Sequence, residues 1–147
     1  MKLLATIGVL AMALVGCGQH LADPYVPSPL VLSIWTDSAT AHGTRVGAQY
    51  QCTMTFKALG NVGRDGDVAT FTGGTLTIAP KGGTAADTPL TADEVSAFFG
   101  VTEVKPGEAI PTQQVISSSG PFTSTLVVRY TMDGAAKETL PSSFTCT

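Results

Sequence analysis

Charged residues are scarce in this chain of 147 residues: they make up 13% of it, and acidic residues outnumber basic ones by eleven to eight. The sequence has no cluster of lysine and arginine, which is what proteins use to hold the phosphates of nucleic acids. It also lacks the G-x-S-x-G pattern of a serine nucleophile. These absences argue against a nucleic-acid partner and against a hydrolase with a G-x-S-x-G serine nucleophile.

Candidate catalytic and metal-binding side chains are few. Histidine occurs only at His20 and His42, and neither has cysteine or acidic neighbours at the spacing of a metal site. The run Asp65–Asp67 has part of the alternating oxygen pattern of a calcium loop, but no glutamate follows at the required distance, and aspartate and glycine also favour turns. Asp93 and Glu94 fall in the first turn of a predicted helix, where carboxylates complement the dipole. We therefore expect no metal, no cofactor and no catalytic residue.

The N-terminal apolar run is short. Lys2 precedes fourteen uncharged residues, Leu3 to Gly16, whereas a permanent membrane-spanning helix needs about 20. A positive start, a short apolar stretch and a small residue at its end form the layout of a secretory signal peptide. The sequence therefore predicts a signal peptide over residues 1–16.

A cysteine follows this stretch directly. Leu14, Val15, Gly16 and Cys17 resemble, position by position, the lipobox of bacterial lipoproteins. The resemblance implies cleavage before Cys17, a diacylglycerol on its sulfur, and a protein anchored in the bacterial cell envelope. Gly18 is not the aspartate that retains lipoproteins at the inner membrane, so the outer membrane is expected if the bacterium has one. The alternative is an ordinary signal peptide followed by a chance cysteine.

Residues 17–29 are predicted to be a tether. They contain Pro24, Pro27 and Pro29, and proline favours an extended chain. At about 3.1 Å per residue in the polyproline form, the twelve residues after Cys17 reach almost 40 Å. Such a tether holds a folded domain clear of the lipid headgroups.

The chain has three cysteines. If Cys17 carries lipid, Cys52 and Cys146 remain, and export places them in an oxidising compartment. We therefore predict a Cys52–Cys146 disulfide. A redox or metal site with two free thiols is the alternative, but the pair lacks a C-x-x-C spacing and nearby histidines.

The part that follows is rich in strand signals. Twenty of the 131 residues after Gly16 are threonine, and glycine and proline punctuate the sequence. Residues 45–57 alternate between apolar and polar side chains, which predicts one strand with a buried and a solvated face. Gly73 and Gly74 predict a bulge or corner, and Asp133 and Gly134 predict a hairpin. The expected strands are 30–36, 45–57, 68–80, 112–118, 121–132 and 136–146, with loops at 60–67 and 81–89. Residues 68–80 are either one bent strand or a pair of strands.

One segment has the signals of a helix instead. Thr91 and Glu94 form a capping box, and Gly100 is a natural stop. Three apolar residues between them share one helical face: Val95, Phe98 and Phe99. We expect one short helix near 91–99 that closes an end of the sheets.

Together these elements predict a mainly β fold: an antiparallel, immunoglobulin-like β-sandwich over residues 30–147. Two features depart from true immunoglobulin domains, because Cys146 lies at the end of the chain and Trp35 precedes Cys52. Trp35 and Tyr50 are expected in the core, although a carbohydrate platform is an alternative.

The predicted function is that of a non-enzymatic, lipid-anchored envelope protein. It would bind an unidentified protein or glycan, or have a structural role. One alternative is a small envelope enzyme, or an inhibitor of one, whose site is scattered along the sequence. Another is a ligand carrier, which would need a barrel with an apolar cavity.

Overall fold

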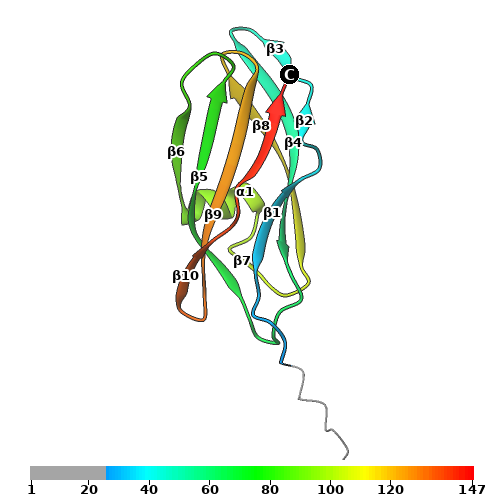
Figure 1. Ribbon diagram of the computed structural model, residues 1–147, viewed down its shortest axis with the longest axis vertical. Coiled ribbons are helices and arrows are strands. Elements are labelled where there is room, and N and C mark those ends of the chain that lie inside the picture. The colour runs from blue at the N-terminus through cyan, green and yellow to red at the C-terminus, as the bar shows by residue number, and fades with distance from the viewer. Residues whose placement is uncertain (1–25) are drawn as a thin grey trace, which may run out of the picture.

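The structure, a computed structural model, describes residues 26–147 (Figure 1). The predictions of a signal peptide over 1–16, of a lipid on Cys17 and of most of the tether therefore lie outside the described residues. Two β-sheets pack face to face into an elongated sandwich, and the described chain enters it at one pole. The mainly β sandwich with one short helix is confirmed.

The smaller sheet is built around its longest strand. Strand β4 pairs with β8 along one edge, and β1 and β3 follow each other along its other edge. All these pairings are antiparallel. The four strands are β1 (Leu32–Thr36), β3 (Thr44–Val46), β4 (Gln49–Gly60) and β8 (Ala109–Ser118).

The larger sheet has β9 and β5 at its centre, in the order β2-β11-β9-β5-β6, with β10 beside β9 and β7 beside β5. Its β2–β11 pair is parallel, so the sandwich is not wholly antiparallel as predicted. The seven strands are β2 (Thr40–Ala41), β5 (Ala69–Pro80), β6 (Ala86–Thr91), β7 (Glu103–Val104), β9 (Phe122–Met132), β10 (Ala135–Glu138) and β11 (Ser142–Cys146).

The predicted strand at 45–57 is wrong at its start. Gly47 has φ 61° and forms a turn with Ala48, so residues 44–46 are a separate strand that folds back on β4. Val46 is consequently exposed. From Cys52 onward the predicted alternation holds, with every second side chain of β4 in the core.

Three other strand predictions have different outcomes. The strand at 136–146 is interrupted at residues 139–141, where Pro141 has no N–H to donate to a ladder. The loop at 81–89 is shorter than predicted, because β6 begins at Ala86. The bulge is confirmed: the β5–β9 register shifts between Phe71 and Gly73, and Gly73 has φ 144°. The Asp133–Gly134 hairpin is confirmed as well.

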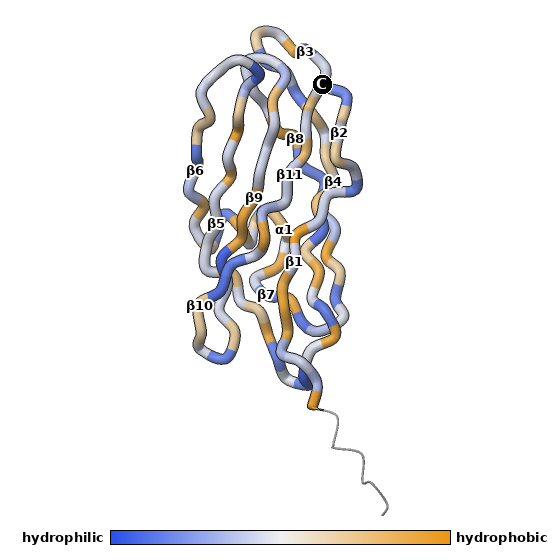
Figure 2. The backbone as a smooth tube through the Cα atoms, in the orientation of Figure 1, coloured by the Kyte–Doolittle hydropathy of each residue, from blue (hydrophilic) through white to orange (hydrophobic). Residues whose placement is uncertain are grey.

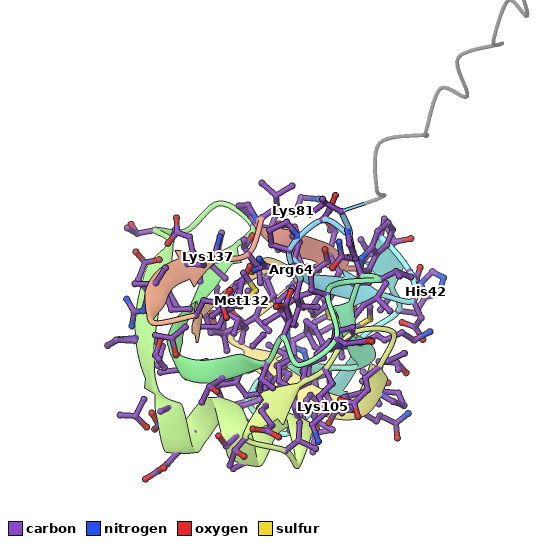
Figure 3. The ribbon with its side chains drawn as sticks, turned by 90° about the horizontal axis from the view of Figure 1, so that it is seen from below. His42, Arg64, Lys81, Lys105, Met132 and Lys137 are labelled. Atoms are coloured by element: carbon purple, nitrogen blue, oxygen red, sulfur yellow. A yellow bond between two sulfur atoms is a disulfide. The ribbon has the colours of Figure 1, made fainter. Side chains whose placement is uncertain are left out.

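Helix α1 (Ala92–Phe99) begins and ends as predicted. The Thr91 hydroxyl accepts a hydrogen bond from the Glu94 N–H at 3.2 Å, and Glu94 accepts one from the Thr91 N–H at 2.7 Å. This second bond holds the pKa of Glu94 below its ordinary value. Gly100 ends the helix in the left-handed conformation. The position differs from the prediction: α1 contacts β5, β6 and β8 and closes one side of the sandwich rather than its end (Figure 3).

The core lies between the sheets, and hydrophobic residues run along β1 and β9 in Figure 2. A Cys52–Cys146 disulfide with a Cα–Cα distance of 6.0 Å joins β4 to β11, and thus one sheet to the other. It is the bridge that the sequence predicted. Close to it the rings of Phe56, Phe122 and Phe144 meet edge to face, with centroids 5.9 and 6.1 Å apart.

Ser124 is a polar residue inside this core. Its side chain is fully buried, and its hydroxyl has no hydrogen-bond partner among the described residues. A buried hydroxyl without a partner costs about 1–3 kcal/mol. We expect Ser124→Ala to raise the free energy of unfolding by about 1 kcal/mol, measured by urea denaturation. The control is Ser143→Ala, whose exposed hydroxyl bonds Thr125 at 2.7 Å and should give no gain. A destabilised Ser124→Ala variant would contradict the expectation.

Candidate functional site

Trp35 lies on the outer face of the smaller sheet, with 60% of its surface exposed. Side chains alternate along β1, and Leu32 and Ile34 occupy the positions that face the core. The prediction that Trp35 packs in the core is therefore wrong. Tyr50 is half-buried beside Gly43 and does not share a surface with Trp35, so the two do not form a joint platform.

A groove of about 360 Å³ runs beside the Trp35 side chain on this outer face. Lys57, directly across from Trp35 in the β1–β4 register, borders it, and so does Leu59. The other lining residues are polar: Thr36, Asp37 and Thr55. The indole thus offers an apolar surface with hydroxyl, carboxylate and ammonium groups around it.

A second groove, of about 320 Å³, lies on the other side of Trp35. Strand β1 forms one wall of it, and residues 140–143, which lead into β11, form the other. Leu140 in this wall is 86% exposed. Trp35 borders both grooves, so β1 has an open cavity on each side.

The other residues considered for chemistry are dispersed. His42 is exposed at the outer rim of the molecule in Figure 3, away from Arg64, which neighbours Asp67. Asp93 and Glu94 belong to the first turn of α1. Within residues 26–147, no three side chains of histidine, cysteine, aspartate and glutamate come together in a way that would suit a metal ion. In the same part of the chain, no helix has the length and apolarity to cross a bilayer.

Asp67, part of the calcium-loop pattern, has a structural position that the sequence did not reveal. It is buried, and its carboxylate accepts hydrogen bonds from the N–H of Leu30 at 2.8 Å and of Arg64 at 3.2 Å. The Leu30 bond is the main reason that the pKa of Asp67 lies below its ordinary value, and the nearby guanidinium of Arg64 adds to this. Arg64 also pairs with Asp133 at 2.7 Å. Asp67 therefore fixes the point where the chain enters the sandwich.

We expect Asp67→Asn to destabilise the fold at neutral pH, because the amide cannot replace a charged acceptor of two N–H groups, of which that of Leu30 is buried. The control is Asp65→Asn, an exposed residue of the same turn, which should leave the unfolding midpoint almost unchanged. Since the folded-state pKa of Asp67 is lowered, its contribution is complete above the ordinary value of 3.8 and is lost as pH falls through the folded-state value. Denaturant titrations of both variants and the parent from pH 7 to pH 2 measure this. Equal midpoints for Asp67→Asn and Asp65→Asn at pH 7 would contradict it.

Similarity to known proteins is confined to the fold. No protein-family model and no curated protein matches the chain. The fold is similar to that of a structural-genomics target named SoR45, with a TM-score of 0.57 and 12% identity over 80% of this chain and 86% of that one. It is also similar to a target from Bordetella pertussis provisionally named ApaA, with a TM-score of 0.56 and 14% identity over 84% of this chain and 97% of that one. Identities this low carry no information on function.

The sequence contained a signal for the exposed indole. In residues 30–36, Leu30, Leu32 and Ile34 occupy even-numbered positions, and Trp35 shares the odd-numbered positions with Val31 and Ser33. Period-two alternation assigns Trp35 to the opposite face from the three aliphatic residues. Trp35 was predicted to lie in the core because it sits within a strong strand pattern, but the alternation within that strand assigns it to the outer face.

Proposed function

We propose that this chain is a lipid-anchored, non-enzymatic binding module of the bacterial cell envelope. The observation that carries the proposal is the lipobox-like run Leu14-Val15-Gly16-Cys17, which directly follows a lysine and a short apolar stretch. Each buried methylene contributes about 0.8 kcal/mol, and two acyl chains together give stable attachment to a membrane. A protein modified in this way would remain on the envelope.

The position of the N-terminal end of the sandwich is compatible with such an anchor. The described chain enters at one pole, where the Leu30 N–H bonds the buried Asp67. The C-terminus lies near the opposite pole (Figure 1). The residues between Cys17 and Leu30 would then suspend a rigid domain from the membrane by one end and leave its long sides open to partners.

A binding role is supported by the surface of the described domain. The grooves on both sides of Trp35 are open and partly apolar, and exposed tryptophan is enriched where proteins bind partners. Neither groove places a histidine beside a carboxylate, which is the pairing that acid–base chemistry most often uses. We therefore favour recognition over turnover.

The first test is the intact mass of the protein purified from the membrane fraction of its native host, before and after reduction. The expected mass is that of residues 17–147 plus acyl chains, and reduction should add one pair of hydrogens. A Cys17→Ser variant should lose the acyl mass and leave the membrane fraction, whereas the Cys52→Ala/Cys146→Ala control should stay acylated. An unacylated parent protein would overturn the anchor. Any catalytic turnover that a point substitution abolishes would overturn the non-enzymatic role.

A further inference from the structure

The free edge of β1 lacks the protection that most other sheet edges have. An open edge invites pairing with another chain, and proteins usually block it with a proline or a charged side chain. Among the described residues, every edge strand contains such a residue except β1, the two-residue β2, and the part of β11 that β2 leaves unpaired, Ser142–Phe144. These residues are Arg45 in β3, Asp87 and Pro89 in β6, Glu103 in β7, Pro111 in β8, and Lys137 and Glu138 in β10. Strand β1 has the sequence LSIWT, without proline or charge.

The hydrogen bonds show which backbone groups of β1 are directed away from β4. Val31 accepts a bond from Asn61 next to β4, and Asp37 donates one to Thr55 of β4. Bonding alternates along an antiparallel pair, so the even-numbered residues between them face outward. The N–H of Leu32 does so and bonds the Tyr130 hydroxyl of the other sheet at 3.3 Å. The N–H and C=O groups of Ile34 and Thr36 are left along the free edge, which pairs with no other described strand.

An added strand would meet side chains on both faces of the smaller sheet. A strand placed beside β1 would point alternate side chains to opposite sides of the sheet. One set would lie beside the exposed Trp35 on the outer face, and the other would face the groove walled by Leu140 and the start of β11. Backbone pairing together with alternating pockets is how extended peptides are recognised at sheet edges.

We propose that β1 is the docking edge for an extended segment of a partner protein, which adds to the smaller sheet as a further strand antiparallel or parallel to β1. The segment should carry uncharged, apolar side chains where it faces Trp35 and the groove walled by Leu140. This deepens the proposed function by naming the kind of partner, and it rests on that function for its biological setting. An extended peptide suits this edge better than a glycan, because only a second backbone matches a row of alternating N–H and C=O groups.

The test uses the full chain, purified in detergent from whichever cell fraction contains it, so that it does not depend on the anchor. A phage-displayed library of random linear peptides is the probe. Enriched peptides are then synthesised, and their affinities are measured by biolayer interferometry. Bound peptides should protect the amides of Ile34 and Thr36 from hydrogen exchange.

Two substitutions at one position separate backbone pairing from side-chain contact. Thr36→Pro removes an outward N–H without breaking the ladder to β4, a setting in which edge prolines are tolerated, and it should weaken peptide binding by about tenfold or more. Thr36→Val keeps the N–H, removes the hydroxyl, and should bind within about twofold of the parent. As a readout that does not depend on the fold of a variant, N-methylation of the peptide at the paired set of alternate residues should abolish binding. N-methylation of the other set should not.

Several outcomes would overturn the proposal. They are the absence of any enriched peptide, protection that maps away from β1, and equal binding by Thr36→Pro and the parent. Binding of soluble peptidoglycan fragments that Trp35→Ala abolishes and Thr36→Pro spares would instead identify a glycan site. Concentration-dependent dimers that Thr36→Pro dissolves would identify a second copy as the occupant. The anchor is measured separately by mass, so failure here leaves that result unaffected.

Discussion

Replacing Cys52 and Cys146 together by alanine is expected to lower the free energy of unfolding by about 4–5 kcal/mol. The bridge joins residues 94 positions apart, and in the chain-entropy model a loop of this length restricts the unfolded ensemble by about that amount. Net stabilities of single domains are only about 5–15 kcal/mol. The loss would therefore remove a large share of the total stability.

The measurement is urea denaturation of the parent and the double variant, each with and without a reductant. Reductant should destabilise the parent and leave the double variant unchanged. The bridge also joins β4 to the β11–β2 corner, where Thr145 and Thr147 donate hydrogen bonds to Ala39 and Ala41. These two amides should exchange faster in the double variant. A loss below about 1 kcal/mol would mean that the disulfide does not constrain the unfolded chain as the entropy model requires.

Local signals in the sequence predicted local structure well. The helix was predicted because Thr91, Glu94 and Gly100 act within a few residues of one another. The disulfide followed from counting cysteines, since only one pairing remained once Cys17 was set aside. The turn at Gly47 was missed because a two-residue hairpin interrupts a strand without disturbing the alternation of side chains on either side of it.

Features that depend on distant contacts could not be predicted in the same way. The carboxylate of Asp67 finds the N–H of Leu30 across 37 residues, and nothing near either residue indicates the pairing. Strand β6 is almost wholly exposed, so its sequence shows no alternation of apolar and polar residues that would predict a strand. It forms because β5 offers it a backbone to pair with. The second groove beside Trp35 exists only because residues 140–143 lie next to β1 when the sheets pack.

The proposed lipid anchor and the proposed docking edge of β1 are compatible with each other in the fold. A protein held on a membrane at one pole meets partners along its sides, and β1 lies on such a side rather than at the far pole (Figure 1). The edge begins just after Leu30, whose backbone is fixed by Asp67.

The second large effect is expected at Phe56, which lies in the core where the two sheets and helix α1 meet. Its side chain is fully buried, with ring centroids 5.2 Å from Phe98 of α1 and 5.9 Å from Phe144 of β11. Truncation to alanine loses the free energy gained by moving the ring from water into the core. It also leaves a cavity between the two sheets and the helix. We expect Phe56→Ala to lower the free energy of unfolding by about 3–5 kcal/mol.

The matched control is Trp35→Ala on the neighbouring strand, which also removes a large aromatic side chain but from an exposed position. Its effect should stay within about 0.5 kcal/mol, as is usual for surface substitutions. Urea denaturation of both variants measures the difference. If Trp35→Ala were as destabilising as Phe56→Ala, Trp35 would belong to the core. The grooves beside it would then no longer be a candidate binding surface. If only Phe56→Ala lowers the free energy of unfolding strongly, the core between the sheets stabilises the domain. The outer face of β1, which carries Trp35, is then not needed for stability and is free to bind a partner.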